Sequence, residues 1–164
     1  MRNLMMSLFV LSFALAVQAQ DAERFISVPA GGVPELVLKV PAKTIVTPIK
    51  GKTVIHTKDM FLHIWAVNNA SNVTEGVSRV ADVIKGEVLN FKPTATNDLL
   101  LAQTSAKRLI GPATEADDGD EGNAEVIVFT IGGRVFVACI HGEGPLNLIE
   151  HKAMLETLQT AKAP

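Results

Sequence analysis

The chain of 164 residues contains one cysteine, one tryptophan and no tyrosine, and these scarcities exclude several classes of protein. Because Cys139 has no second cysteine to bond, the sequence is not that of a small disulfide-stabilised scaffold. Aromatic residues make up 5% of the chain, too few to predict a surface that stacks on sugars or nucleic-acid bases. A formal net charge of −2 gives no electrostatic reason to bind nucleic acid or anionic lipid.

Only one long apolar run is present, and it stands at the beginning of the chain. Met1–Asn3 forms a short basic start, Leu4–Val17 is almost wholly apolar, and Ala16–Ala19 carries small residues at the two positions that a signal peptidase reads. The run is too short for a membrane anchor, so residues 1–19 are predicted to be a secretory signal that is cut after Ala19. We therefore expect a periplasmic or secreted protein with no membrane insertion after removal of the signal.

The rest of the sequence predicts one domain, since no internal repeat or linker divides it. We expect a flexible segment at residues 20–32, within which residues 25–28 can add an edge strand, followed by a single domain over residues 33–164. Short strands separated by prolines are predicted at residues 36–40, 44–46 and 52–56, and a stronger strand, apolar on both faces, at residues 60–67.

The clearest helix is predicted over residues 72–89. Asn72 can cap its first turn, and Glu75 stands three residues on, as a capping box requires. Apolar residues recur at helical spacing and form one stripe: Val73, Val77, Val80, Ala81, Ile84 and Val88. Because Gly76 and Gly86 weaken a helix, packing must hold this one in place.

The second half of the chain is rich in β structure. Strands are predicted at residues 99–102 and 106–110, and a hairpin from Val126 to Ile140 turns at Gly132-Gly133, where a type I′ turn needs two positive φ angles. Cys139 lies inside this hairpin and is expected to be buried and unreactive. A closing helix follows Pro145, with apolar positions at Leu148, Met154, Leu155, Leu158 and Ala161. This order predicts an α+β fold, a mainly antiparallel sheet packed by helices.

The order of elements resembles the PsbP-like fold, whose members include the lumenal photosystem II subunit of plants and small bacterial envelope proteins. The similar stretch runs from Asn72 through Leu158 and comprises the capped helix, the strand at residues 106–109, the Gly-Gly hairpin and the final helix. The resemblance implies an α/β/α sandwich and a non-catalytic domain that binds a protein or small ligand, or assists assembly, in the cell envelope. It implies no cofactor and transfers no functional residue.

Two histidines carry the alternative hypothesis, a metal-binding protein or metal-dependent enzyme. If the hairpin that follows His56 is centred between Asp59 and Met60, His56 and His63 lie directly opposite each other, with Cβ atoms about 4.5–5.5 Å apart. Further ligands would have to come from Asp59, His141 or Glu143. The simpler interpretation is two unrelated histidines near a strand end.

An acidic loop follows the strands of the second half. Asp117, Asp118, Asp120, Glu121 and Asn123 are hard oxygen ligands of the kind that Ca²⁺ prefers. The spacing within residues 117–123 fails the EF-hand pattern, because Gly122 stands where a third ligand is required. A solvated turn is the competing interpretation, so cation binding here is left open.

Other polar residues suggest no catalytic set. His141 follows a buried strand, a place where enzymes often carry catalytic groups, but the sequence places no nucleophile or second acid beside it. Lys107 and Arg108 point to opposite sides of a strand and are expected to form surface salt bridges. The face that Trp65 and His63 share is expected to pack in the core. We assign no catalytic residue from the sequence.

Overall fold

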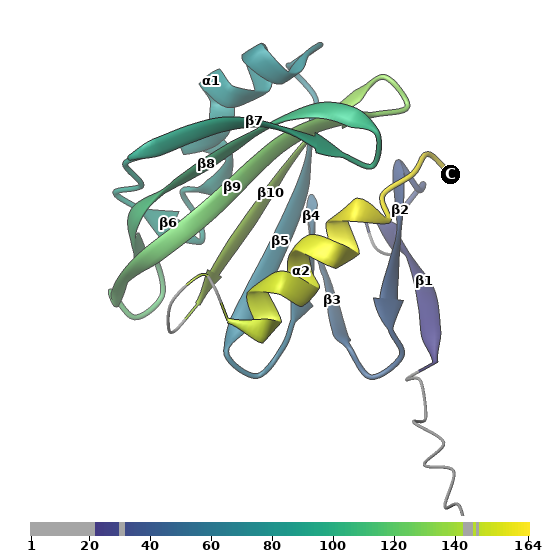
Figure 1. Cartoon of the computed structure of the whole chain (residues 1–164), viewed down its shortest axis with the longest axis horizontal. Helices are drawn as coiled ribbons and strands as arrows, with labels where there is room; N and C mark the ends of the chain where they lie inside the picture. Colours follow the sequence, from purple (N-terminus) through teal and green to yellow (C-terminus); the bar gives the residue numbers. More distant parts are fainter. Residues whose placement is uncertain (1–21, 30–31, 143–145, 147) are drawn as a thin grey trace, which may run out of the picture.

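The computed structural model of this protein describes residues 22–29, 32–142, 146 and 148–164, and the predicted signal at residues 1–19 lies outside them. Ten strands and two helices follow one another in the described part (Figure 1). They are β1 (Glu23–Val28), β2 (Leu36–Pro41), β3 (Ile45–Ile49), β4 (Lys52–His56), β5 (Met60–Val67), α1 (Val73–Ile84), β6 (Val88–Leu89), β7 (Ala95–Leu101), β8 (Thr104–Glu115), β9 (Glu121–Ile131), β10 (Arg134–Gly142) and α2 (Ile149–Gln159).

The strands build one large, curled antiparallel sheet. Its order is β3-β4-β5-β10-β9-β8-β6, with β7 also paired to β8, while β1 and β2 form a separate hairpin. The two helices lie on opposite faces of the large sheet (Figure 1). The α+β prediction is confirmed, and the layers are those of an α/β/α sandwich. Neither α1 nor α2, the helices of the described residues, has the length and apolar content to span a membrane.

Both faces of the central strands are buried, as an apolar run without alternation predicts. Phe136, Ala138 and Ile140 of β10 join the core beneath α2, and Val135, Val137 and Cys139 join the core beneath α1. The β9–β10 hairpin turns at Gly132 and Gly133, whose φ angles are +57° and +76°, which confirms the predicted turn. Burial raises the pKa of the Cys139 thiol, which disfavours the thiolate form that a nucleophile requires.

Helix α1 begins as predicted and ends earlier. Asn72 Oδ1 accepts a hydrogen bond from Glu75 N at 2.9 Å, and Glu75 Oε2 accepts one from Ser71 N at 2.8 Å. The helix ends at Ile84 instead of Leu89, because Val88 leaves the helix to pair with Glu115 in the sheet. Gly76 lets α1 approach the sheet closely, since a Cβ there would lie 2.5 Å from Val128 Cγ1.

The segment predicted to be flexible contains ordered structure. Strand β1 lies within residues 20–32 and pairs along its whole length with β2. Val28 is buried in the main core, so this strand belongs to the packed domain. Strand β2 also joins the C-terminal tail through hydrogen bonds between Val37 and Lys162.

Candidate functional site

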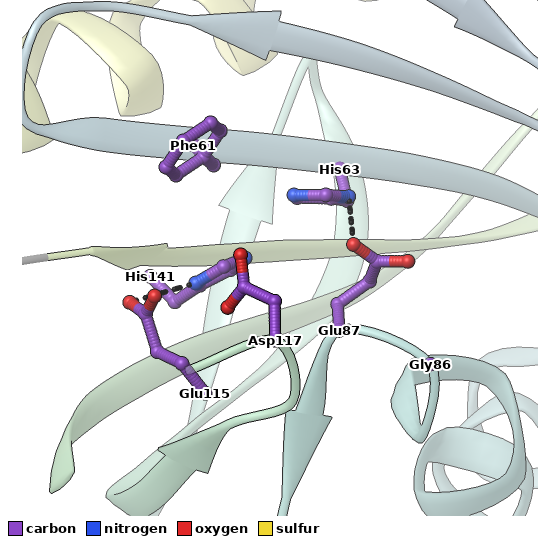
Figure 2. Close-up of a pocket in the computed structure, with 7 residues that line it drawn as sticks. All are labelled: Phe61, His63, Gly86, Glu87, Glu115, Asp117 and His141. Atoms are coloured by element: carbon purple, nitrogen blue, oxygen red, sulfur yellow. Dashed lines mark hydrogen bonds and ion pairs between the residues drawn. The ribbon is translucent and has the colours of Figure 1, made fainter. Parts of the chain in front are cut away.

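A pocket of about 100 Å³ opens on the α1 face of the sheet, beside the end of that helix (Figure 2). Strands β5 and β10 form its floor, the turn between α1 and β6 forms one wall, and the end of β8 with the following turn forms the other. Its lining residues are Phe61, His63, Gly86, Glu87, Glu115, Asp117 and His141.

Strand pairing brings the two histidines of this pocket together. In the β5–β10 register Cys139 lies opposite His63, and His141 lies opposite Phe61. His63 and His141 are therefore diagonal neighbours on one face of the sheet, with ring centroids 4.9 Å apart. The histidine beside His63 is thus His141, which the sequence analysis considered as a further ligand and, separately, as a possible catalytic group.

His56 does not take the predicted position opposite His63. Strand β4 pairs His56 with Phe61, and the two rings stack with centroids 4.8 Å apart, so Phe61 stands between His56 and the pocket. The centre of the hairpin lies one residue earlier in the sequence than predicted. Two sets of hydrogen bonds hold the turn in this position. Thr57 N donates to Met60 O, and Glu150 of α2 accepts from Thr57 Oγ1 and Asp59 N. Glu143, another proposed ligand, lies outside the described residues.

His63 is buried without hydrogen bonds. The residue is 4% exposed, and neither of its ring nitrogens has a hydrogen-bond partner. Glu87 Oε2 lies 3.3 Å from His63 Nδ1, but without hydrogen-bonding geometry, and the same carboxylate is paired with the ammonium of Lys52. Burial, with smaller contributions from His141 and Lys52, lowers the pKa of His63 from 6.5 to about 3. The imidazole is therefore neutral at physiological pH.

His141 faces the acidic wall of the pocket. Its Nδ1 lies 3.2 Å from Glu115 Oε1, while its Nε2 is buried without a partner. Glu115, Asp117 and Asp118 each place a carboxylate oxygen within 4.8 Å of the others. The acidic loop that the sequence offered as a cation site therefore begins at the rim of the pocket. Imidazole and carboxylate atoms make the pocket rich in electron-pair donors.

The described lining of the pocket contains groups for acid–base chemistry but no hydroxyl or thiol nucleophile. No serine, threonine or cysteine is among the described residues that line it, and Cys139, which pairs with His63, is buried in the sheet. A cavity of about 100 Å³ is also smaller than the roughly 300–1,000 Å³ of pockets that enclose organic ligands. The arrangement suits an ion or a few water molecules better than an organic substrate.

Two pocket residues were missed in the sequence. Glu87 lies inside the helix predicted over residues 72–89. It reaches the pocket because α1 ends at Ile84, before Glu87. Glu115 lies two residues before the acidic loop at residues 117–123, and nothing in the local sequence signals its approach to His141. Gly86 before Glu87 is the one available signal, since a glycine near a helix end often marks a change of direction.

A second cluster of ionisable residues lies on the opposite face, beneath α2. The fully buried Glu125 Oε2 accepts hydrogen bonds from Arg108 at 2.6 Å and from His151 Nε2 at 3.0 Å. Burial raises the pKa of Glu125, but the bonds and charges of His151 and Arg108 outweigh it and hold the pKa below its usual value. Arg108 therefore binds an internal partner, contrary to the surface role that was predicted for it.

The curled antiparallel sheet between two helices defines a domain of PsbP-like fold, as the order of elements predicted. No protein-family model matches the sequence, and no curated protein matches it significantly. Among the solved structures that the chain resembles is the solution structure of cyanobacterial PsbP (CyanoP) from Synechocystis sp. PCC 6803. The match covers 88% of this chain and 94% of that chain, with a TM-score of 0.55 and 12% sequence identity. At this identity the likeness establishes the fold alone.

Proposed function

We propose that this chain is an exported, non-catalytic domain that binds a protein partner or assists its assembly outside the cytoplasm. The observation that carries the proposal is the composition and size of the pocket, whose described lining has no hydroxyl or thiol nucleophile and whose volume is small for an organic substrate. The likeness in fold to a cyanobacterial PsbP supports it. Export is inferred from residues 1–19 of the sequence.

The β3 edge of the large sheet is the surface that suits a protein partner best. Ile45 on this strand is 56% exposed, and a broad, open and mostly apolar depression of about 630 Å³ lies beside it. Pro48 lacks the N–H that an added strand would bond, so continuous main-chain pairing is interrupted there. Recognition at this edge would therefore depend on side-chain contacts across the depression. Its lining residues are Pro41, Lys43, Thr44, Ile45, His56, Thr57 and Lys58.

Affinity capture with a matched pair of variants tests this proposal. The protein without residues 1–19 is immobilised and exposed to the native envelope fraction, and any captured protein is purified and its dissociation constant measured. Ile45→Asp should abolish binding, because it places a charge in the apolar contact. Leu100→Asp is the control, since Leu100 is 70% exposed on β7, away from β3. If both variants lose affinity equally, or if neither loses affinity, β3 is not the binding surface.

A further inference from the structure

The depression at the β3 edge lies between two turns that leave the sheet at the same end. Strand β3 begins at Ile45, which pairs with His56 at the end of β4, so the turn before β3 and the turn after β4 lie at one end of these strands (Figure 1). Lys43 from the first turn and Lys58 from the second line the depression together with Ile45. Cations from two segments of the chain therefore border one mostly apolar surface.

The charge of this depression is opposite to that of the whole chain. Among the described residues that line it, Lys43 and Lys58 are basic and none is acidic, whereas the chain carries a formal net charge of −2. Arg24 adds a third cation beside it, where the guanidinium donates a hydrogen bond to Thr44 O at 2.7 Å. A local concentration of positive charge attracts a negatively charged partner and fixes its orientation.

Two carboxylates stand near the depression, and each already has a contact within the chain. Asp59 lies 3.8 Å from Lys58 Nζ, but the lysine side chain is 87% exposed, and an exposed pair of this kind contributes little. Glu150 Oε2 accepts hydrogen bonds from Thr57 Oγ1 and Asp59 N, which hold it toward α2. Lys58 can therefore exchange Asp59 for a carboxylate of a partner at little cost.

We propose that the depression binds an acidic and apolar peptide segment of the partner protein. Aliphatic side chains of the segment lie against Ile45, and its aspartate or glutamate side chains pair with Lys43 and Lys58. This assignment rests on the proposed function, because it names the chemistry of the partner at the same edge of the sheet.

The shape of the depression favours a peptide segment over a small molecule or a lipid surface. It is open, with a volume of about 630 Å³, so a small molecule would stay largely in water, whereas an extended segment can lie along it. A flat anionic membrane would meet Asp59 as well as the lysines. A narrow segment between the two turns fits these charges better.

Selection from a random peptide library tests this chemistry. The protein without residues 1–19 is immobilised, bound peptides are selected and sequenced, and their dissociation constants are measured. Peptides that combine aspartate or glutamate with leucine, isoleucine or valine should be enriched, and Ile45→Asp should abolish their binding. Raising the ionic strength from about 0.05 M to about 0.5 M should weaken binding severalfold, because salt screens exposed charges.

Lys58→Glu and Lys85→Glu form a matched pair of variants. The two lysine side chains are 87% and 72% exposed, and each lies near one aspartate, at 3.8 Å and 3.9 Å. Lys58→Glu should weaken the selected peptides by about fivefold or more, because it replaces an attraction by a repulsion. Lys85 follows α1, away from β3, so Lys85→Glu should leave the affinity within about twofold of the wild type.

Three results would overturn the proposal: enrichment of basic or uncharged peptides or of none, equal effects of the two lysine variants, or co-sedimentation with phosphatidylglycerol vesicles in place of peptide binding. The proposed function can fail or survive separately. A captured envelope protein that depends on Ile45, but not on Lys58 or ionic strength, would keep β3 as the binding surface and exclude only the acidic segment. Capture that does not depend on Ile45 would exclude the surface itself.

Discussion

The two faces of the sheet each bury histidine beside glutamate, but the histidines differ in their hydrogen bonds, although Glu125 Oε1 and Arg108 Nε beneath α2 also lack a partner. Beneath α2, two donors from different elements, Arg108 and His151, converge on one carboxylate oxygen of Glu125. On the α1 face, His63 and His141 meet carboxylates with three of their four ring nitrogens left without a hydrogen bond. Beneath α2, ion pairs and hydrogen bonds of the Glu125 cluster connect elements of the fold. On the α1 face, the unpaired ring nitrogens remain available to a ligand.

The number of elements that each carboxylate joins adds to this difference between the histidines. Glu125 joins β9 to β8 through Arg108 and to α2 through His151, so it links three elements. The pocket on the other face also draws on several elements, but of its four ring nitrogens only His141 Nδ1 gains a hydrogen-bond partner from that assembly, Glu115. Unpaired buried groups persist where they serve a function or are offset by packing nearby, and a pair of substitutions can distinguish these cases.

Replacing each buried histidine by leucine should give the largest contrast. His151→Leu leaves the buried Glu125 with one partner fewer and should lower the free energy of unfolding by about 3 kcal/mol. His63→Leu removes a buried group that has no hydrogen bond and should change stability by less than about 1 kcal/mol, in either direction. Urea denaturation of both variants measures the difference. Equal destabilisation would show that His63 makes stabilising interactions comparable to those of His151.

Gly76→Ala should damage the α1 face and leave the α2 face intact. The added Cβ would lie 2.5 Å from Val128 Cγ1 and 2.7 Å from Val135 Cγ1, so α1 must move away from the sheet. Overpacking of this kind costs about 2 kcal/mol, even though alanine favours helices. Chemical shifts in NMR spectra should change around Glu87 in the pocket and remain unchanged around His151. A variant more stable than the wild type would contradict the close contact.

Acid should destabilise the protein through His63. Its folded-state pKa of about 3 lies below the unfolded value of 6.5, so the unfolded chain binds the proton first as pH falls. Stability is therefore fully present above pH 6.5 and is lost below it, by about 1.5 kcal/mol between pH 7.5 and 5.5. His63→Leu should lack this loss, as urea titrations at the two pH values would reveal. Glu125, with a lowered carboxyl pKa, contributes its own acid loss only below about pH 4.5.

The sequence predicts those parts of this fold that local rules determine. The capping box of Asn72 and Glu75 and the Gly132-Gly133 turn depend on neighbours within a few residues, and both are confirmed. The end of α1 was misplaced because Val88 satisfies the helical stripe, while its pairing with Glu115 is a long-range contact. Periodicity alone cannot weigh a sheet pairing against one more helical turn.

The site depends on registers that the sequence leaves open. His63 meets His141 only because β5 pairs with β10, and these strands are far apart in the sequence. His56 is separated from His63 because Glu150, on the distant helix α2, helps to fix the turn at Thr57. A shift of one residue in the centre of a hairpin changes which side chains face each other. The sequence therefore identified three pocket residues, His63, His141 and Asp117, but not their association.

The two helices also begin in different ways, and the smallest predicted effect tests that difference. Asn72 caps α1 with its own side chain, whereas Leu148 gives α2 no side-chain cap, and Glu150 and His151 attach that end to the sheet instead. Asn72→Ala should therefore cost about 1 kcal/mol, the usual value of a lost cap. Leu148→Asp should gain less than about 1 kcal/mol, since tertiary contacts already hold the start of α2. Thermal melting of both variants provides the comparison, and a larger gain at Leu148 would mean that the contacts of Glu150 and His151 hold α2 only weakly.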